Sequence, residues 1–240
     1  MLLQHNVTSH FLLHLCAYPL NSVSVLALIT HTYFIIQIVH KYFAVAVYGR
    51  LSLGAEHTLI LERDGTVWAT GHNLYGQLGM DPRDHSTVRT FREVVIDSAK
   101  AVAAGGGHSM VLKQDGSVWS TGRNEFGQLG NGLKNGCKSF TLVISGHATA
   151  IAAGTKHSLV VMEDGGVWAA GVNQYGQLGD GSTYQRNTFV QVISGGAAVA
   201  AAGKDHSMVL KHDGSVWTAG FNGYGQLGAD PQLMSAFSCR

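Results

Sequence analysis

Charged residues are scarce in this chain. Asp, Glu, Lys and Arg make up 13% of its 240 residues, against roughly a quarter in an average domain. The 16 basic and 15 acidic side chains leave a formal net charge of +1. That balance gives no overall electrostatic footprint for nucleic acid or for an anionic membrane. Since no Lys/Arg-rich tail is present either, the sequence argues against direct binding of nucleic acid.

Cysteine is also scarce, and its spacing defines no site. The three cysteines, Cys16, Cys137 and Cys239, lie far apart and form no CxxC pair. A disulfide framework or a structural zinc site requires closer or paired cysteines. We therefore expect neither of them, and no other metal or cofactor. A chain of this length can bury a sizeable core without such cross-links.

Residues 1–48 lack glycine entirely and contain one charged side chain, Lys41, whereas all 31 glycines and all four tryptophans lie in residues 49–240. The sequence therefore predicts two parts that meet near Gly49. Within the first part, residues 22–39 carry no charge and are long enough to span a bilayer as one helix. No basic residue precedes this run, so a cleaved signal peptide is not expected.

Three interpretations of this apolar segment stay open. It is a membrane anchor, a packed or aggregating hydrophobic extension, or a stretch that does not belong to the native protein. Val, Ile, Tyr, Phe and Thr dominate it, which favours strands over a helix. If residues 22–39 do insert, Lys41 and Arg50 on their C-terminal side predict a cytoplasmic C-terminal part. Otherwise the second part fits the cytoplasm or the nucleus.

Residues 49–240 are built from four copies of one unit. The copies begin near residues 50, 101, 150 and 199, and their histidines are 51, 49 and 49 residues apart. Inside each copy the histidine precedes the tryptophan by the same number of residues, and all length variation follows the GQLG sequence. The copies read HTLILERDGTVWATGHNLYGQLG from His57, HSMVLKQDGSVWSTGRNEFGQLG from His108, HSLVVMEDGGVWAAGVNQYGQLG from His157 and HSMVLKHDGSVWTAGFNGYGQLG from His206.

Each copy predicts about four short strands. An Asp-Gly pair, such as Asp64-Gly65, lies between two β-prone runs and predicts a tight hairpin of type I′, which needs positive φ at both central residues. The runs beside it are apolar almost throughout, which is typical of sheets that are covered on both faces. A glycine-rich turn follows at 73–79, and a further strand returns to the next copy.

Four-stranded units of this period are typical of radial β architectures, in which each blade packs on its neighbours. The pattern GxxHS-[LM]-V-L-x-x-DG-x-VW-x-x-G-x-N-x-[YF]-GQLG resembles the repeat of the regulator of chromosome condensation family of β-propellers. The fold class is therefore predicted as all-β, a partial propeller of about four four-stranded blades after an apolar segment that is either helical or β-prone. The resemblance implies a ring that usually has seven blades, so about three are missing here.

The residues that every copy shares have simple structural explanations. We expect each histidine to bond to turn backbone with help from the adjoining Ser or Thr, and each tryptophan to fill space between blades. The glycines permit turn conformations that other residues avoid. These positions are His57, His108, His157, His206, Trp68, Trp119, Trp168, Trp217, Gly76, Gly127, Gly176 and Gly225. None of them is predicted as a metal ligand or a catalytic group, because equivalent positions on successive blades lie apart.

Binding specificity is expected in the parts that differ, which are the loops after GQLG. Equivalent loops of stacked blades emerge on one face, so their side chains are predicted to form one moderately basic surface for an acidic protein patch. An inert solvated rim is the other interpretation. The candidate residues are Arg83, Arg89, Arg92, Lys134, Lys138, Tyr184 and Arg186.

The sequence thus predicts a non-enzymatic protein-interaction scaffold. The resemblance implies an alternative, since founding members of the family catalyse nucleotide exchange on the small GTPase Ran, an activity that needs no acid, base or nucleophile. A membrane-tethered regulatory domain is a third reading, which depends on residues 22–39. The end blades lack neighbours, so self-association through them is also expected.

Overall fold

The computed structural model describes residues 50–94, 96–228 and 237–239, all of which belong to the compact unit Val45–Arg240. The expectations for residues 1–48, including the apolar run 22–39, lie outside these ranges. Among the residues that are described, no helix is long and apolar enough to cross a membrane.

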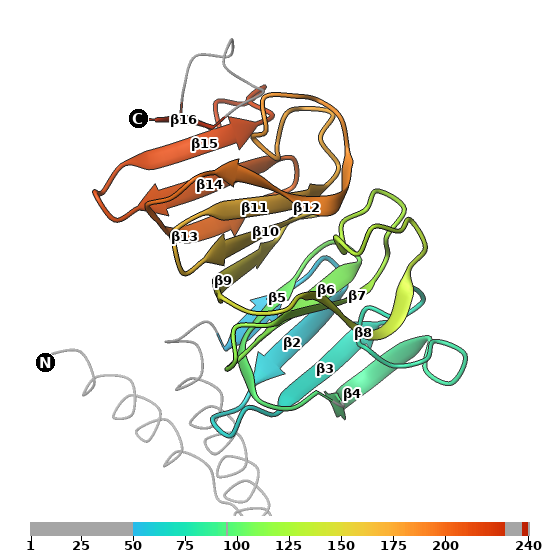
Figure 1. Ribbon diagram of the computed structural model, residues 1–240. Helices are drawn as coiled ribbons and strands as arrows, with labels where there is room; N and C mark the ends of the chain where they lie inside the picture. Colours follow the sequence, from blue (N-terminus) through green and yellow to red (C-terminus); the bar gives the residue numbers. More distant parts are fainter. Residues whose placement is uncertain (1–49, 95, 229–236, 240) are drawn as a thin grey trace, which may run out of the picture. The chain divides into compact units, whose positions relative to one another are not determined.

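The described residues form four antiparallel sheets of four strands, one for each copy of the repeat (Figure 1). We call them blades 1 to 4 in chain order. Blade 1 contains β1 (Leu51–Leu53), β2 (His57–Leu61), β3 (Val67–His72) and β4 (Thr87–Val94). Blade 2 contains β5 (Ala99–Ala104), β6 (His108–Lys113), β7 (Val118–Gly122) and β8 (Cys137–Ile144). Blade 3 contains β9 (Ala148–Ala153), β10 (His157–Met162), β11 (Val167–Gly171) and β12 (Arg186–Ile193). Blade 4 contains β13 (Ala197–Ala202), β14 (His206–Lys211), β15 (Val216–Gly220) and β16 (Ser238–Cys239).

The strands of a blade run from an inner to an outer position. The four inner strands are followed directly by Gly54, Gly105, Gly154 and Gly203, which line one shared cavity of about 210 Å³. Small side chains and glycine suit this place because neighbouring blades approach most closely there: Ala55 donates its backbone N–H to the Gly105 carbonyl at 3.2 Å. The expected all-β architecture of radial blades is confirmed.

The hairpin between the second and third strand is not of the expected type I′. Gly65 has a φ of +91°, but Asp64 does not appear among the non-glycine residues with positive φ. Gly65 donates its N–H to the Glu62 carbonyl and Glu62 donates to the Thr66 carbonyl, which makes a three-residue loop with glycine at its left-handed position. The Asp64 carboxylate accepts the Thr66 N–H at 2.9 Å. Aspartate therefore keeps a right-handed conformation and stabilises the turn through its side chain.

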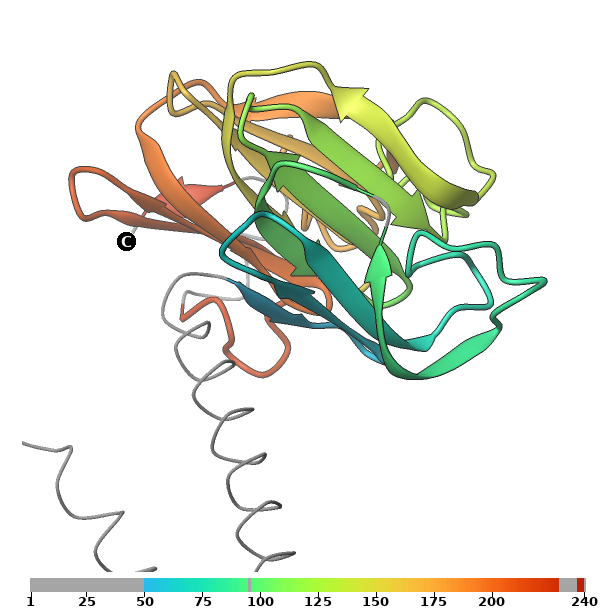
Figure 2. The same ribbon diagram turned by 90° about the horizontal axis from the view of Figure 1, so that it is seen from below.

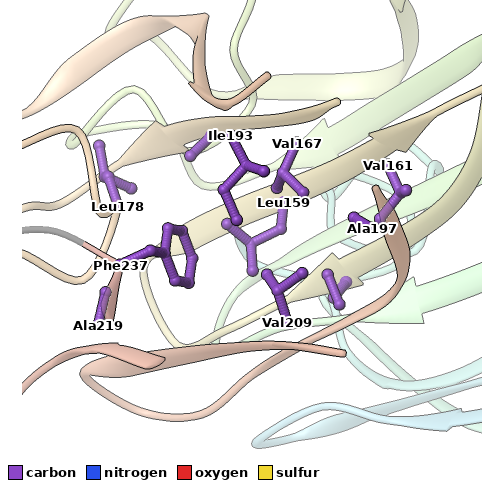
Figure 3. Packing of buried hydrophobic residues seen from close by; sticks show 12 residues of the cluster. Leu159, Val161, Val167, Leu178, Ile193, Ala197, Val209, Ala219 and Phe237 are labelled. Atoms are coloured by element: carbon purple, nitrogen blue, oxygen red, sulfur yellow. The ribbon is translucent and has the colours of Figure 1, made fainter. Parts of the chain in front are cut away.

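The sheets follow one another in chain order (Figures 1 and 2). The buried hydrophobic clusters lie in the interfaces between successive blades. In the interface of blades 3 and 4, Leu159 and Val167 pack against Val209 and Phe237 (Figure 3). Similar clusters join blades 1 and 2 and blades 2 and 3. Both faces of β6 and β10 are buried, as the uninterrupted apolar runs predict. A blade is therefore stabilised mainly by its neighbours.

Two rims result from the strand directions. The loop rim comprises the loops between the third and fourth strands, residues 73–86, 123–136, 172–185 and 221–228. The hairpin rim comprises the turns between the second and third strands, residues 62–66, 114–117, 163–166 and 212–215. The rims lie at opposite ends of the strands.

Candidate functional site: the inter-blade histidines and the loop rim

The repeated histidines connect blades. The Nε2 atom of His108 in blade 2 lies 2.9 Å from the hydroxyl of Ser158 in blade 3. That hydroxyl donates to the backbone carbonyl of Gln128, back in blade 2, at 2.7 Å. The same chain of bonds recurs twice, as His57–Ser109–Gln77 and His157–Ser207–Gln177. The partner of each histidine is therefore the serine of the next copy, and not turn backbone or the adjoining hydroxyl as expected.

This geometry fixes the proton on the imidazole. Because the Ser158 hydroxyl gives its proton to the Gln128 carbonyl, it can only accept from His108, so Nε2 of the histidine carries the hydrogen. The Nδ1 atom is buried and has no hydrogen-bond partner in the described part of the chain. A protonated ring would bury a second, unpaired N–H there. The neutral form is therefore favoured.

Burial lowers the pKa of all three histidines. The pKa of His108 falls to about 3, with further repulsion from His57 and His157. The pKa of His57 falls to about 4 through burial and the nearby His72, and that of His157 falls to about 4 through burial and His206. These groups are neutral at physiological pH.

A histidine next to a serine resembles a base and its nucleophile, but this pair is arranged the wrong way for that chemistry. An activating base must offer its lone pair to the hydroxyl proton. Here the imidazole presents an N–H, and the Ser158 proton points to the Gln128 carbonyl. Both side chains are also fully buried. The arrangement holds adjacent blades together and does not activate a nucleophile.

Each loop of the loop rim is fixed by a buried asparagine. The Oδ1 atom of Asn124 accepts the Leu129 N–H at 3.0 Å. Its Nδ2 atom donates to the carbonyls of Leu133 and Asn135 at 3.0 and 3.1 Å. Asn73 and Asn173 hold their loops in the same way. Our sequence reasoning gave these asparagines no role, although their recurrence before the YGQLG or FGQLG turn was a signal.

The turn glycines allow the next blade to approach. Gly76 has a φ of +79°, and a Cβ there would lie 2.5 Å from the Lys138 Cα of blade 2. Gly127 meets Asn187 of blade 3 at the same distance. Gly176 and Gly225 also have positive φ, +73° and +77°. A Cβ at Gly225, in blade 4, would have no atom within 4 Å. The glycine requirement at the first two positions is thus set by backbone conformation and by the neighbouring blade.

The tryptophans lie at partly buried positions of the third strands. Trp217 packs against the cluster between blades 3 and 4, and Trp168 borders a small cavity between blades 2 and 3. Lys113 lies over Trp119, with its Nζ atom 4.9 Å from the ring centroid. Trp68 has the equivalent place in blade 1. These contacts fit the space-filling role that the repeat predicts for them.

The predicted partner-binding residues do not form one continuous patch of available charge. Arg83 is paired with Asp81 at 2.7 Å, and Lys138 of blade 2 lies 3.8 Å from the same carboxylate. Arg186 is bound to the buried Asp180 at 2.7 Å, so it supports its own loop. Burial raises the pKa of Asp180, but hydrogen bonds from Ser182 and Arg186 outweigh it, and the net shift is downward.

The remaining candidates are exposed. Lys134 is exposed at the tip of its loop, and Tyr184 is 75% exposed. Arg89 and Arg92 lie on β4, the outer strand of blade 1, where Arg92 contacts His85 at 2.8 Å. The structure therefore places Lys134 and Tyr184 on the loop rim as accessible groups, and Lys138 of β8 and the two arginines of β4 beside it.

Aromatic rings add to the loop rim at a position that the sequence reasoning did not use. Tyr75 of blade 1 lies under the Arg123 guanidinium of blade 2, at 4.9 Å from centroid to Cζ. Between blades 2 and 3, Lys156 lies over Phe126 at 4.7 Å, a similar contact made from a different position of the repeat. Tyr75 remains 39% exposed. Each ring therefore closes an inter-blade interface and still offers an apolar surface to a partner.

The two rims differ in how acidic they are. The hairpin rim contains Glu62, Asp64, Asp115, Glu163, Asp164 and Asp213 against Arg63 alone, whereas the loop rim is close to balanced, with Asp81, Asp84, Glu125 and Asp180 against Arg83, Arg123 and Lys134. Within the described ranges, no three His, Cys, Asp or Glu side chains come together as a group that could hold a metal ion. The loop rim is thus distinguished by its aromatic rings with cations beside them, and by a nearly balanced charge.

Comparison with known families gives two matches. A family model described as "Regulator of chromosome condensation (RCC1) repeat" matches residues 50–77, 99–128, 148–177 and 198–226. A second model with the same description matches residues 64–112, 115–161 and 164–210.

Similar proteins carry the same repeat. The probable E3 ubiquitin-protein ligase HERC4 of Homo sapiens is 37% identical over 83 residues, which are 34% of this chain and 8% of that protein. The X-linked retinitis pigmentosa GTPase regulator homolog of Caenorhabditis elegans is 36% identical over 88 residues, 35% of this chain and 6% of that protein. The solved structure of Prp20p from Saccharomyces cerevisiae superposes with a TM-score of 0.70 at 22% identity, over 79% of this chain and 49% of that one. The chain thus spans about half of that propeller and less than a tenth of the two curated relatives.

Proposed function

Since the chain belongs to the Regulator of chromosome condensation (RCC1) repeat family, we propose that it is a protein-interaction module whose partner contacts the loop rim. The observation that supports this most is the combination of rigidity and exposure on that rim. Asn73, Asn124 and Asn173 fix the loops from inside, so side chains at their tips are presented without a large ordering cost on binding.

The chemistry of the rim suggests the kind of partner. Lys134 on the rim and Lys138 beside it, on β8, offer cations, while Tyr184 and Tyr75 offer large apolar surfaces with a polar end. Aromatic residues contribute strongly to protein interfaces. An acidic protein patch with apolar residues beside it is complementary to this combination. The paired arginines, Arg83 and Arg186, support the loops of the proposed interface.

Charge reversal on the two rims tests this proposal. The variant Lys134→Glu is expected to weaken capture of a specific partner by about tenfold or more, whereas Arg63→Glu, an exposed cation on the hairpin rim, is expected to leave it unchanged. The measurement is quantitative affinity capture with both variants and the unaltered protein, followed by titration of each enriched protein. A partner that is lost equally from both variants, or from neither, contradicts binding at the loop rim.

A second candidate is nucleotide exchange on a small GTPase. One relative is named a GTPase regulator homolog, and the Prp20p structure is described together with its binding properties to Gsp1p and histones. Exchange would use the same rim, because an inserted loop or side chain can displace a nucleotide without acid–base chemistry. This candidate predicts faster release of a fluorescent nucleotide from at least one member of a GTPase panel. Release at the buffer rate from every member, with a known exchanger active in parallel, removes it.

A further inference from the structure

Blades 1 and 4 each expose an apolar face whose equivalent in the other blades is buried. Met208 and Leu210 of β14 are 37% and 43% exposed, whereas the equivalent Met110 and Leu112 of β6 are 0% exposed. In blade 2, the face that carries Met110 and Leu112 packs on blade 3. The face of blade 4 therefore has the composition of an inter-blade interface but is open to solvent.

The opposite face of blade 1 is open in the same way. Leu51 and Leu53 of β1 are 43% and 70% exposed, whereas Val102 and Ala104, which hold these positions in β5, are both 7% exposed. Between blades 1 and 2, Leu61 and Ala104 belong to one buried cluster. Leu210 and Leu53 are the residues of blades 4 and 1 that correspond to this pair. The two open faces thus carry the two halves of one apolar contact.

Their polar groups are complementary as well. His206 of blade 4 corresponds to the three histidines that bond to the serine of the following blade, and no hydrogen bond of its imidazole occurs within the described residues. In blade 1 the serine position is held by Thr58, whose hydroxyl can accept from an imidazole and donate to a carbonyl as serine does. At the other interfaces this histidine–hydroxyl distance is 2.8 to 2.9 Å.

Backbone groups near the axis follow the same rule. Thr155 donates its N–H to the Gly203 carbonyl of the next blade at 3.2 Å, and Gly106 donates in the same way to Gly154. Lys204 is the equivalent donor in blade 4, and the Gly54 carbonyl is the equivalent acceptor in blade 1. The histidine–hydroxyl bond and the axial backbone bond of the three internal interfaces therefore both have counterparts on the two open faces.

We propose that blade 4 of one copy of this chain packs on blade 1 of a second copy, through the contacts that join blades within a copy. The interface is heterologous, because it joins two different faces, and such an interface forms a ring when its rotation closes. Two copies contribute eight blades, which lies within the range of 4 to 8 that propellers adopt. The loop rim takes no part, so this proposal stands independently of the proposed function.

Complementary charge variants of the full chain test it. Leu53→Lys and Leu210→Glu each place a charge in the proposed contact, at positions exposed enough to leave the blade itself folded, which circular dichroism checks. Each variant alone is expected to dissociate at least about tenfold more readily than the unaltered chain. An equimolar mixture is expected to associate again, because one interface then pairs Lys with Glu and the other keeps both leucines. Sedimentation velocity measures all three samples.

The matched control is Leu142→Glu on β8, which is 46% exposed on an outer strand and lies away from both open faces. It is expected to associate as the unaltered chain does. Persisting association in both single variants would show that another part of the chain makes the contact, and would overturn the proposal. So would an unaltered chain that stays monomeric at about 100 µM, or a mixture that fails to recover. An assembly of two copies and an assembly of more copies would each support head-to-tail pairing.

Discussion

Replacing Gly105 by alanine is expected to lower the free energy of unfolding by about 2 to 5 kcal/mol. A Cβ at this position would lie 2.4 Å from His108 Cε1 and 2.4 Å from the carbonyl oxygen of Gly154 in the next blade. The φ of Gly105 is not in the left-handed region, so the cost is steric and not conformational. Moving the imidazole away would also break its bond to Ser158 and leave buried polar groups without partners.

The control for this substitution is Gly146→Ala. The added methyl group there would have only the Asp115 carbonyl oxygen, at 3.7 Å, within 4 Å, and the φ is again not positive. Both variants reduce the entropy of the unfolded chain equally, so any difference between them reports on the inter-blade contact. Urea unfolding of both, followed by circular dichroism, makes the comparison. Equal stability of the two variants would contradict the close approach of blades at Gly105.

The sequence was sufficient to predict the blades because their signals are local. Apolar runs, Asp-Gly and GQLG recur with fixed spacing, and each determines the conformation of a few neighbouring residues. The type of hairpin was not predictable in this way. Asp64-Gly65 is compatible with a type I′ turn and with the three-residue loop that is found, and the choice depends on the pairing of Glu62 with Thr66.

The hydrogen-bond partner of the repeated histidine could not be predicted from the sequence, for a different reason. Every copy contains both a histidine and a neighbouring hydroxyl residue, so pairing within one copy and pairing with the next copy predict the same pattern of residues. Only the packing of blades shows that His57 reaches Ser109. The loop residues pose a similar problem: the sequence alone does not show that Arg186 is bound to Asp180, at 2.7 Å, and is not free for a partner.

The outer strand of blade 4 is equivalent to those of the other blades in its pairing, although its local sequence differs. Ser238–Cys239 pair with Trp217 and Thr218, where the other blades have a full strand. Phe237 then occupies the place of Phe140 and Phe189, each packed against a GQLG glycine of the preceding blade. The aromatic residue before the pairing segment is what these outer strands share, and its spacing from GQLG differs among the blades.

Acidification is expected to unfold the blades between pH 6.5 and about 4. The pKa of His57, His108 and His157 is lowered from 6.5 to about 4, 3 and 4 in the folded protein. The unfolded chain therefore takes up these protons first, so stability is complete above pH 6.5, falls as the pH drops towards about 4, and levels off below the folded-state values. Each histidine contributes on the order of 3 kcal/mol to this loss, and three together are comparable to the whole stability of a domain.

The hydrogen-bonded carboxylates Asp97 and Asp115 do not account for a loss in this range. The pKa of Asp97 is lowered by its bond to Lys113, and that of Asp115 by its bond to Ser117, so their contributions disappear only at more acid pH. Urea unfolding measured from pH 7.5 to 4.5 should thus show a steep decline that His147→Gln does not alter, because His147 is exposed on the hairpin side next to Glu163. A free energy of unfolding that stays constant down to pH 5 would refute neutral, buried histidines as the links between blades. In the neutral ring the Nε2 hydrogen faces serine, so the imidazole does not serve as a base towards that hydroxyl. Because a second proton on the buried ring would have no partner, the same arrangement makes the stacking of blades sensitive to acid.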